Sequence, residues 1–253
     1  MPALTLHFHP DWPFGDGLVI EAMAQDGAYR SQFETGTSNG GLFAHPGGLR
    51  WAWESRLFAG RYDDRPAADR PVYGAWNRSD DPYGGSPRFG SAYVRLTEEA
   101  AARATYCFPD SVFDPEEYGG PERLTDLVAL ADERAADPEW DRLDDYVEAQ
   151  VHGGVRFDRD VAAVVLDPAH ADGPVRAAAE RLGCPVELHP GYRVDTARLG
   201  AAYRGEEPYR LAVDLGVELT PDVVAAAARS GRHDPQTVKR VWHLLARFGR
   251  HWA

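Results

Sequence analysis

The spacing of glycine and proline is the feature that most constrains this fold, because it keeps the apolar segments short. The 253-residue chain contains 25 Gly and 19 Pro, residues that typically mark turns. After Tyr192 the pattern is mostly helical, without the regular strand–helix alternation of a doubly wound sheet. We therefore predict an α+β fold with a strand-rich part, residues 1–190, and a helical extension, residues 191–253, packed on it. Segments of strand length lie at residues 4–8, 72–76, 91–96, 104–108, 146–152, 161–166 and 185–188.

The charge of the chain is negative and unevenly distributed. The net charge is −13, and the stretch from Asp110 to Glu148 holds 14 acidic and 3 basic residues. Because binding to a phosphate backbone needs a basic face, this balance disfavours nucleic acid as a partner. The acidic stretch is interpreted as a solvated surface, with a surface that attracts a basic partner as the alternative.

Several absences indicate a cytoplasmic protein without a membrane segment. No apolar run approaches the roughly 20 residues of a spanning helix, and residues 1–10 lack the basic start of a signal peptide. Cys107 and Cys184 do not form a metal-like or redox-like pair, which fits free thiols in a reducing compartment.

The first strand-like segment carries two histidines. His7 and His9 are two residues apart, so on a strand both rings point to the same face. One reading is a His-x-His metal clamp completed by other histidines and carboxylates. The other is that one of the two histidines is structural and hydrogen-bonded.

A polar, glycine-bearing loop follows in the segment Tyr29–Leu42, which we expect to form a strand and then a loop. Gly36, Thr37 and Ser38 lie in it. Glycine lets the backbone approach a ligand, and hydroxyls donate to phosphate or amide groups. The chain has neither a GxGxxG sequence nor a Walker lysine here, so those modes of dinucleotide binding are not supported. An ordinary turn is the alternative.

The segment from Tyr146 to Gly154 predicts a strand with one polar face. Glu148, Gln150 and His152 alternate with apolar residues, so they share one face. Such a face suits the wall of a cleft, and a strand whose outer face meets water is the alternative. Two further segments, around Tyr73 and Arg88, bring arginines suited to a pyrophosphate, although single arginines of this kind are more often surface residues.

Together these segments resemble an uncharacterised bacterial protein family over about residues 4–250. The resemblance implies membership and no activity. It is carried by the strings HFHPD (residues 7–11), YRSQFETGTSNGG (29–41), RPVYGAWN (70–77), PRFGSAYVRL (87–96), RATYCFPDS (103–111), EAQVHG (148–153) and VKRVWHLLARFG (238–249).

The order of elements also resembles the ADP-ribosyltransferase fold, a split antiparallel β-sheet core. That resemblance implies that NAD is the substrate and that His7 or His9 on the first strand holds it. It further implies that Gly36, Thr37 and Ser38 seat the nicotinamide, with Tyr73 and Arg88 assisting in binding. The catalytic pair that it implies is Glu148, which stabilises positive charge on the ribose, and Gln150, which positions the acceptor.

The leading prediction is therefore a mono-ADP-ribosyltransferase, a nucleotide-binding glycosyltransferase that acts on a protein or small-molecule acceptor, with no metal in its site. An NAD glycohydrolase is a close variant, and a metal-dependent hydrolase built on His7 and His9 is a second class. A non-catalytic binding module is a third, in which a surface aromatic such as Trp242 or Trp252 would matter most. The acceptor and the oligomeric state are left open.

Overall fold

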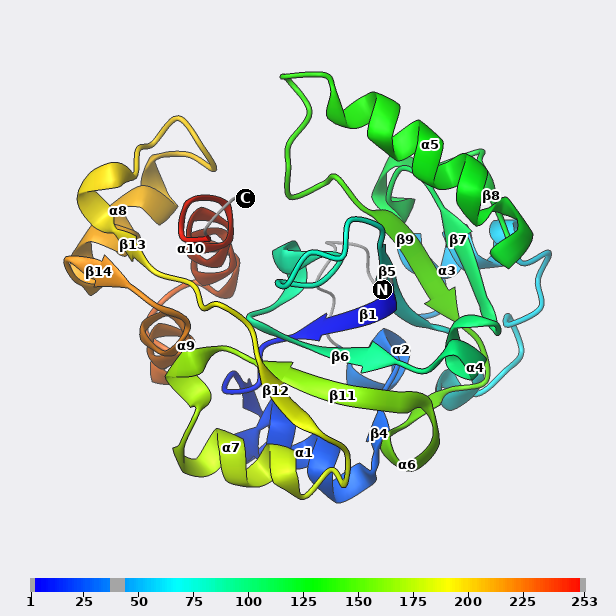
Figure 1. Ribbon diagram of the computed structural model, residues 1–253, viewed down its shortest axis with the longest axis horizontal. Helices are drawn as coiled ribbons and strands as arrows, with labels where there is room; N and C mark the ends of the chain where they lie inside the picture. Colours follow the sequence, from blue (N-terminus) through cyan, green and yellow to red (C-terminus); the bar gives the residue numbers. More distant parts are fainter. Residues whose placement is uncertain (1–2, 37–43, 251–253) are drawn as a thin grey trace.

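A large mixed sheet forms the centre of the protein (Figure 1). The computed structural model describes residues 3–36 and 44–250. Eight strands lie in the order β12-β11-β6-β1-β5-β9-β7-β8, and all neighbours in it are antiparallel except the parallel pair β11–β12. Their bounds are β1 (Ala3–Phe8), β5 (Val72–Asn77), β6 (Ala92–Leu96), β7 (Ala104–Cys107), β8 (Tyr118–Gly119), β9 (Val147–Val151), β11 (Val161–Leu166) and β12 (Val186–Leu188).

Strand β1 joins two halves of this sheet. Its first residues, Ala3 to Thr5, pair with β5, and its last residues, Thr5 to Phe8, pair with β6. Beyond Thr5, β1 and β5 are no longer paired, and the two halves run in different directions (Figure 1). The expected mixture of strands and helices is confirmed. The expected split antiparallel core differs in detail, because β1 holds both halves in one hydrogen-bonded sheet that also contains a parallel pair.

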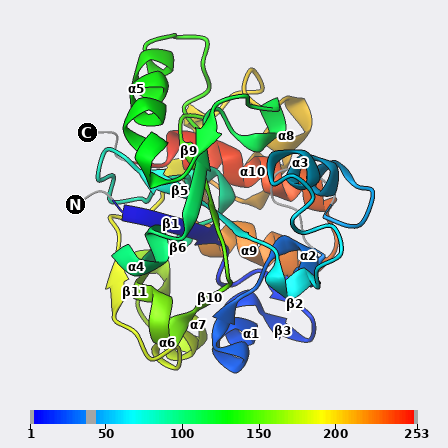
Figure 2. The same ribbon diagram turned by 90° about the vertical axis from the view of Figure 1, so that its right-hand side faces the viewer.

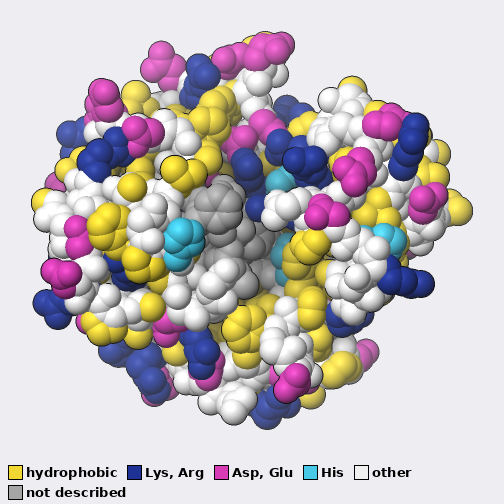
Figure 3. Space-filling model, turned by 180° about the vertical axis from the view of Figure 1, so that it is seen from behind, with side chains coloured by type: hydrophobic (Ala, Val, Ile, Leu, Met, Phe, Trp, Pro, Cys, Tyr) yellow, Lys and Arg dark blue, Asp and Glu magenta, His cyan; other side chains and the backbone are white. Residues whose placement is uncertain are grey.

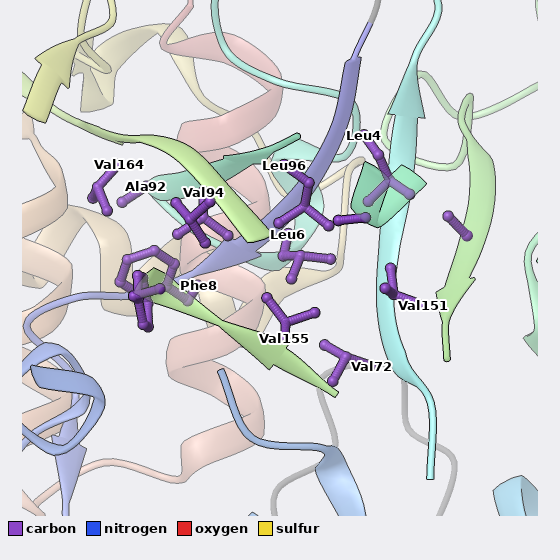
Figure 4. Packing of buried hydrophobic residues seen from close by; sticks show 14 of the residues in the cluster. Leu4, Leu6, Phe8, Val72, Ala92, Val94, Leu96, Val151, Val155 and Val164 are labelled. Carbon is purple, nitrogen blue, oxygen red and sulfur yellow. The ribbon is translucent and has the colours of Figure 1, made fainter. Parts of the chain in front are cut away.

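The apolar face of β1 supplies the main core. Leu4, Leu6 and Phe8 alternate with polar residues and pack among the side chains of both halves (Figure 4). Helices α1 (Val19–Asp26) and α7 (Gly173–Glu180) lie side by side below β11, and α5 (Leu124–Ala135) contacts β7 and β9 (Figure 1). Burial of this apolar surface is the main stabilising contribution. Thr5 and His7 therefore point to the other face of the sheet.

That other face is covered by α3 (Leu49–Leu57) and by C-terminal helices. Figure 2 shows α3 and α10 on the side of the sheet away from α5. The C-terminal helices form a second apolar cluster, which also contains Tyr83 and Leu143. The indole of Trp242 donates to the carbonyls of Pro87 and Arg88 at 3.0 and 3.1 Å, so α10 is fixed to the loop before β6. These helices are α8 (Glu206–Leu215), α9 (Pro221–Ser230) and α10 (Pro235–Phe248).

Short elements complete the described chain, and none of its helices is long and apolar enough to cross a membrane. Two-stranded ladders are formed by β2 (Pro13–Phe14) with β3 (Gly17–Leu18), β4 (Ala28–Tyr29) with β10 (Val155–Arg156), and β13 (Val194–Asp195) with β14 (Glu218–Leu219). The remaining helices are α2 (Gln32–Thr35), α4 (Glu98–Ala101) and α6 (Phe157–Asp160), besides short 3-10 turns.

One local prediction was wrong. The segment from Tyr29 was expected to be a strand followed by a loop, but β4 ends at Tyr29 and α2 begins three residues later. The cause is a reciprocal capping box: the amide of Glu34 donates to the Ser31 hydroxyl at 3.2 Å, and the amide of Ser31 donates to the Glu34 carboxylate at 2.8 Å. A Ser-x-x-Glu sequence satisfies two backbone donors in this way and starts a helix.

Candidate active site

A pocket lies where β1 separates from β5. At the edge of the pocket, Gly74 of β5 allows the two strands to approach closely, because a Cβ on this residue would lie 2.5 Å from the Thr5 carbonyl oxygen. Further along, the unpaired ends of the two strands leave a space of about 410 Å³, including its open mouth. Its walls are His7, Gln32, Arg50, Tyr73, Gly74, Ser86, Phe89, Asp110 and Glu148.

The polar face of β9 forms one side of this pocket. Glu148 pairs with Ala75 of β5 and with Cys107 of β7, and Gln150 pairs with Tyr73 and Thr105, so these side chains share a face. Glu148 is 4% exposed and Gln150 is fully buried. Residues of α3 pack against Cys107 and Tyr73 on this face. The alternative of a strand face that meets water is therefore wrong.

Glu148 is a buried carboxylate held by donors. The hydroxyl of Ser111 donates to Oε2 at 2.9 Å, and the amide of Gln150 donates to Oε1 at 3.0 Å. The pKa of Glu148 is raised to about 8, mainly by burial and also by the charge of Asp110, whereas Arg50 and the two hydrogen bonds act in the opposite direction. A carboxyl group that titrates near neutral pH in a pocket is a frequent property of active sites.

A chain of hydrogen bonds leads from Tyr62 to Glu148. Its steps are Tyr62 to His152 Nδ1 at 2.6 Å, His152 Nε2 to Thr105 Oγ1 at 3.0 Å, Thr105 Oγ1 to Gln150 Oε1 at 2.8 Å, and then the Gln150 bond to Glu148. Since Thr105 donates to the amide oxygen of Gln150, it accepts from an Nε2–H of His152, whose Nδ1 then accepts from Tyr62. Burial lowers the pKa of His152 to about 4, which keeps the ring neutral as this order requires. All four donors point towards Glu148.

Arg50 is the main site residue that sequence reasoning missed. Its guanidinium lies 4.0 Å over the ring of Tyr73 and the residue is 3% exposed. Nε and Nη1 are buried without a hydrogen-bond partner in the described residues. A buried guanidinium with unused donors is suited to an anionic ligand group. A signal existed in the sequence: Arg50 lies on the helical stripe of Trp53 and Leu57, which places it on the buried face of α3.

Two other missed residues come from the acidic stretch. Asp110 and Ser111 were grouped with a solvated surface, but they are 4% and 3% exposed. Asp110 caps a short turn by accepting from the Val112 amide at 2.7 Å and also accepts from the Tyr146 hydroxyl. This turn delivers the Ser111 hydroxyl to Glu148. Part of the acidic stretch therefore lines the pocket instead of facing solvent.

The two predicted histidines lie in different surroundings, His7 on β1 and His9 just beyond its end. His7 lines the Glu148 pocket, but Nδ1 lies 3.2 Å from the Gly90 carbonyl and Nε2 accepts from the Ser86 amide at 3.2 Å. His9 instead stacks on Trp12, with ring centroids 4.0 Å apart. Burial lowers the pKa of each ring to about 3. No group of three His, Cys, Asp or Glu residues converges as a metal site in the described residues, and both nitrogens of His7 are used by backbone groups, so a His-x-His clamp does not fit.

Gly36 and Arg88 do not belong to the walls of this pocket. Gly36 ends α2 in the left-handed conformation, at φ 64°, and Thr37 and Ser38 fall outside the described residues. Arg88 pairs with Asp144. Burial lowers the pKa of Arg88. The charge of Arg204 lowers it further, whereas the charge of Asp110 raises it. Figure 3 shows Lys, Arg and His side chains gathered near the centre of one face of the molecule.

The fold and the site define a mixed α/β protein with a buried carboxylate on an inner strand of a large sheet. The chain belongs to the family described as "Protein of unknown function (DUF3626)", whose profile matches residues 3–136 and 130–248. The expected membership in an uncharacterised family is thereby confirmed. No curated protein matches the chain. A solved structure, "Thermus sp. 2.9 DarT in complex with NAD+", is similar with a TM-score of 0.44 and 11% identity, covering 74% of this chain and 94% of that chain. A similarity this distant does not identify an activity.

Proposed function

We propose that this protein cleaves the bond between nicotinamide and ribose in NAD and transfers ADP-ribose to a protein or small-molecule acceptor. The observation that carries the proposal is the pairing of a buried carboxylate, Glu148, with a buried guanidinium that has unused donors, Arg50, in one pocket. Cleavage of NAD needs both charges, because a cation develops on the ribose while a pyrophosphate must be held close by.

Each wall of the pocket then has a role. Glu148 in its ionised form stabilises the positive charge that develops on the ribose, more in the transition state than in the ground state. Arg50 donates to a phosphate oxygen. Gln150 is committed to Glu148 and Thr105, so it positions the carboxylate and does not reach the acceptor. His7 fixes the loop between Gly84 and Gly90 and acts through the shape of the pocket.

The proposal is tested by incubating the purified protein with NAD and measuring free nicotinamide with and without cell extract. Release that depends on extract indicates transfer to an acceptor, and equal release without it indicates transfer to water, as in a glycohydrolase. No release under either condition contradicts the proposal. We expect the activity to be cytoplasmic and to need no added metal.

The rate of nicotinamide release should rise with pH. The pKa of Glu148 is raised from 4.5 to about 8, so the active carboxylate form is lost as pH falls through 8, by about tenfold per unit below it. The stability of the fold should change in the opposite sense, because the folded protein holds this proton between pH 4.5 and 8 and the unfolded chain does not. A rate that is flat from pH 6 to 9 would contradict this assignment.

Replacing Thr105 by Val should lower kcat about fivefold and move the rise with pH upwards. The change breaks the chain that orients the Gln150 amide, and one hydrogen bond of this kind contributes about 1 kcal/mol. KM for NAD should stay the same, because Thr105 does not line the pocket. Thr105→Ser keeps the hydroxyl and should restore both kcat and the pH profile. A Val variant with an unchanged pH profile would show that the chain is structural only.

A further inference from the structure

A second pocket lies directly beside the Glu148 pocket. Gln32 of α2 belongs to the walls of both. His7 of β1 lines one pocket, while Phe8, the last residue of β1, and His9, which follows it, line the other. The second pocket has an empty volume of about 810 Å³, including its open mouth. A single ligand can therefore extend from one pocket into the other past Gln32, or two reacting ligands can meet there.

The walls of the second pocket are apolar and aromatic. Phe8 and Met23 lie at its base, and Trp12, Phe14 and Tyr29 are half-buried in its sides. The indole of Trp12 is held flat against His9, with 9° between the ring planes, so it is a rigid surface. Such rings accept a flat partner by stacking or edge contact.

Polar groups restrict the ligand further. At the rim, Asp26 and Arg30 form an ion pair at 2.7 Å, so neither leaves an uncompensated charge for a phosphate. The side-chain oxygen of Gln32 is buried and has no hydrogen-bond partner in the described residues. An amide oxygen in this state needs a donor from the ligand.

We infer that this second pocket binds a planar heteroaromatic ring that carries an N–H donor, seated on Trp12 with its N–H group on Gln32. The inference deepens the proposed function, on which its link to NAD rests. The adenine and the nicotinamide carboxamide of NAD both have this chemistry, and so does the base of an aromatic acceptor. The phosphates stay on the Arg50 side.

The test measures binding without turnover, by calorimetry or ligand-observed NMR, with adenosine and nicotinamide as separate probes. One of them should bind to the wild type. Ala22→Phe places a ring inside the pocket and should weaken that binding at least about tenfold. Gln25→Phe adds the same ring at an exposed position of the same helix and should leave it unchanged. Binding of adenosine would indicate that the pocket holds the adenine of NAD or the base of an acceptor. Binding of nicotinamide would indicate that it holds the nicotinamide of NAD.

The role of Gln32 has its own readout. Replacing both N–H hydrogens of the adenosine amino group, or of the nicotinamide carboxamide group, by methyl groups removes the donor. The dimethylated probe should bind the wild type about fivefold more weakly than the unmodified probe. In Gln32→Met, which keeps the length of the side chain, the two forms should bind equally. If neither probe binds, or if Ala22→Phe and Gln25→Phe behave alike, the inference is overturned, even if NAD is cleaved. If a ring binds as described but NAD is not cleaved, the proposed function fails and the ring site stands.

Discussion

Replacing Glu148 by Gln should reduce nicotinamide release from NAD by about 10²–10³-fold, which is the typical cost of removing one electrostatic group from a transition state. The substitution keeps the size of the side chain and removes the negative charge. The new amide oxygen can still accept from Gln150, and the new amide hydrogens can donate to the Ser111 hydroxyl, which accepts as well as donates. Because Glu148 stabilises charge that develops during the reaction, kcat should fall while KM for NAD changes little. The measurement is nicotinamide release over time at pH 9, where the wild-type carboxyl is ionised.

Folding of the variant is expected to be preserved or improved at this pH, since burial disfavours the charged form of Glu148. A loss of activity would therefore not be explained by unfolding. Glu99→Gln is the matched control, because Glu99 is exposed on α4 and does not line the pocket. Full activity in Glu148→Gln would contradict the proposal that NAD is cleaved in this pocket.

Replacing Glu54 by Gln should lower the free energy of unfolding by about 3–5 kcal/mol, the usual cost of leaving one charge of a buried pair without its partner. The Glu54 carboxylate accepts from Arg70 at 2.6 Å and from the Tyr73 hydroxyl at 2.8 Å, on different oxygens. The pair is buried, with side-chain exposures of 4% for Arg70 and 0% for Glu54. A glutamine would present its amide hydrogens to one of the two donors.

The change is measured by urea unfolding, and the thermal midpoint should fall by roughly 10 °C. Arg56→Gln on the same helix breaks the pair with Asp114, in which both side chains are more than half exposed. That control should change stability by less than about 1 kcal/mol. Equal small effects of both substitutions would show that the Glu54–Arg70 pair does not stabilise the fold.

Local patterns of apolar and polar residues in the sequence predicted the parts of this structure that depend on neighbouring residues. The alternation from Val147 to Val151 places Glu148 and Gln150 on one face, and the structure has them so. Helix α10 and strand β11 also follow from local patterns. Such patterns are reliable because the position of a side chain on a strand or helix is set by the backbone alone.

Contacts between distant segments were not predictable in this way. Ser111 meets Glu148 across 37 positions in the chain, and its burial depends on a loop whose composition is that of a surface. The position of Arg50 in the pocket depends on how α3 packs against Cys107 and Tyr73, which no local pattern shows. His7 looked like a ligand-binding group, and only the positions of Ser86 and Gly90 show that both of its nitrogens are occupied. Sequence patterns define faces, whereas tertiary packing decides what each face meets.

The pairing of β1 has a consequence for how the protein folds. This first strand is bound on one side to residues about 70 positions away and on the other to residues about 90 positions away, as Thr5 shows with Ala75 and Arg95. Closing loops of this length is entropically costly before the contacts form, and such non-local pairing slows folding. We therefore expect the two halves of the sheet to reach their final orientation only once β1 pairs with both, so that the pocket between β1 and β5 forms late in folding. A fragment that lacks the first eight residues should then fail to bind the ligand of this pocket.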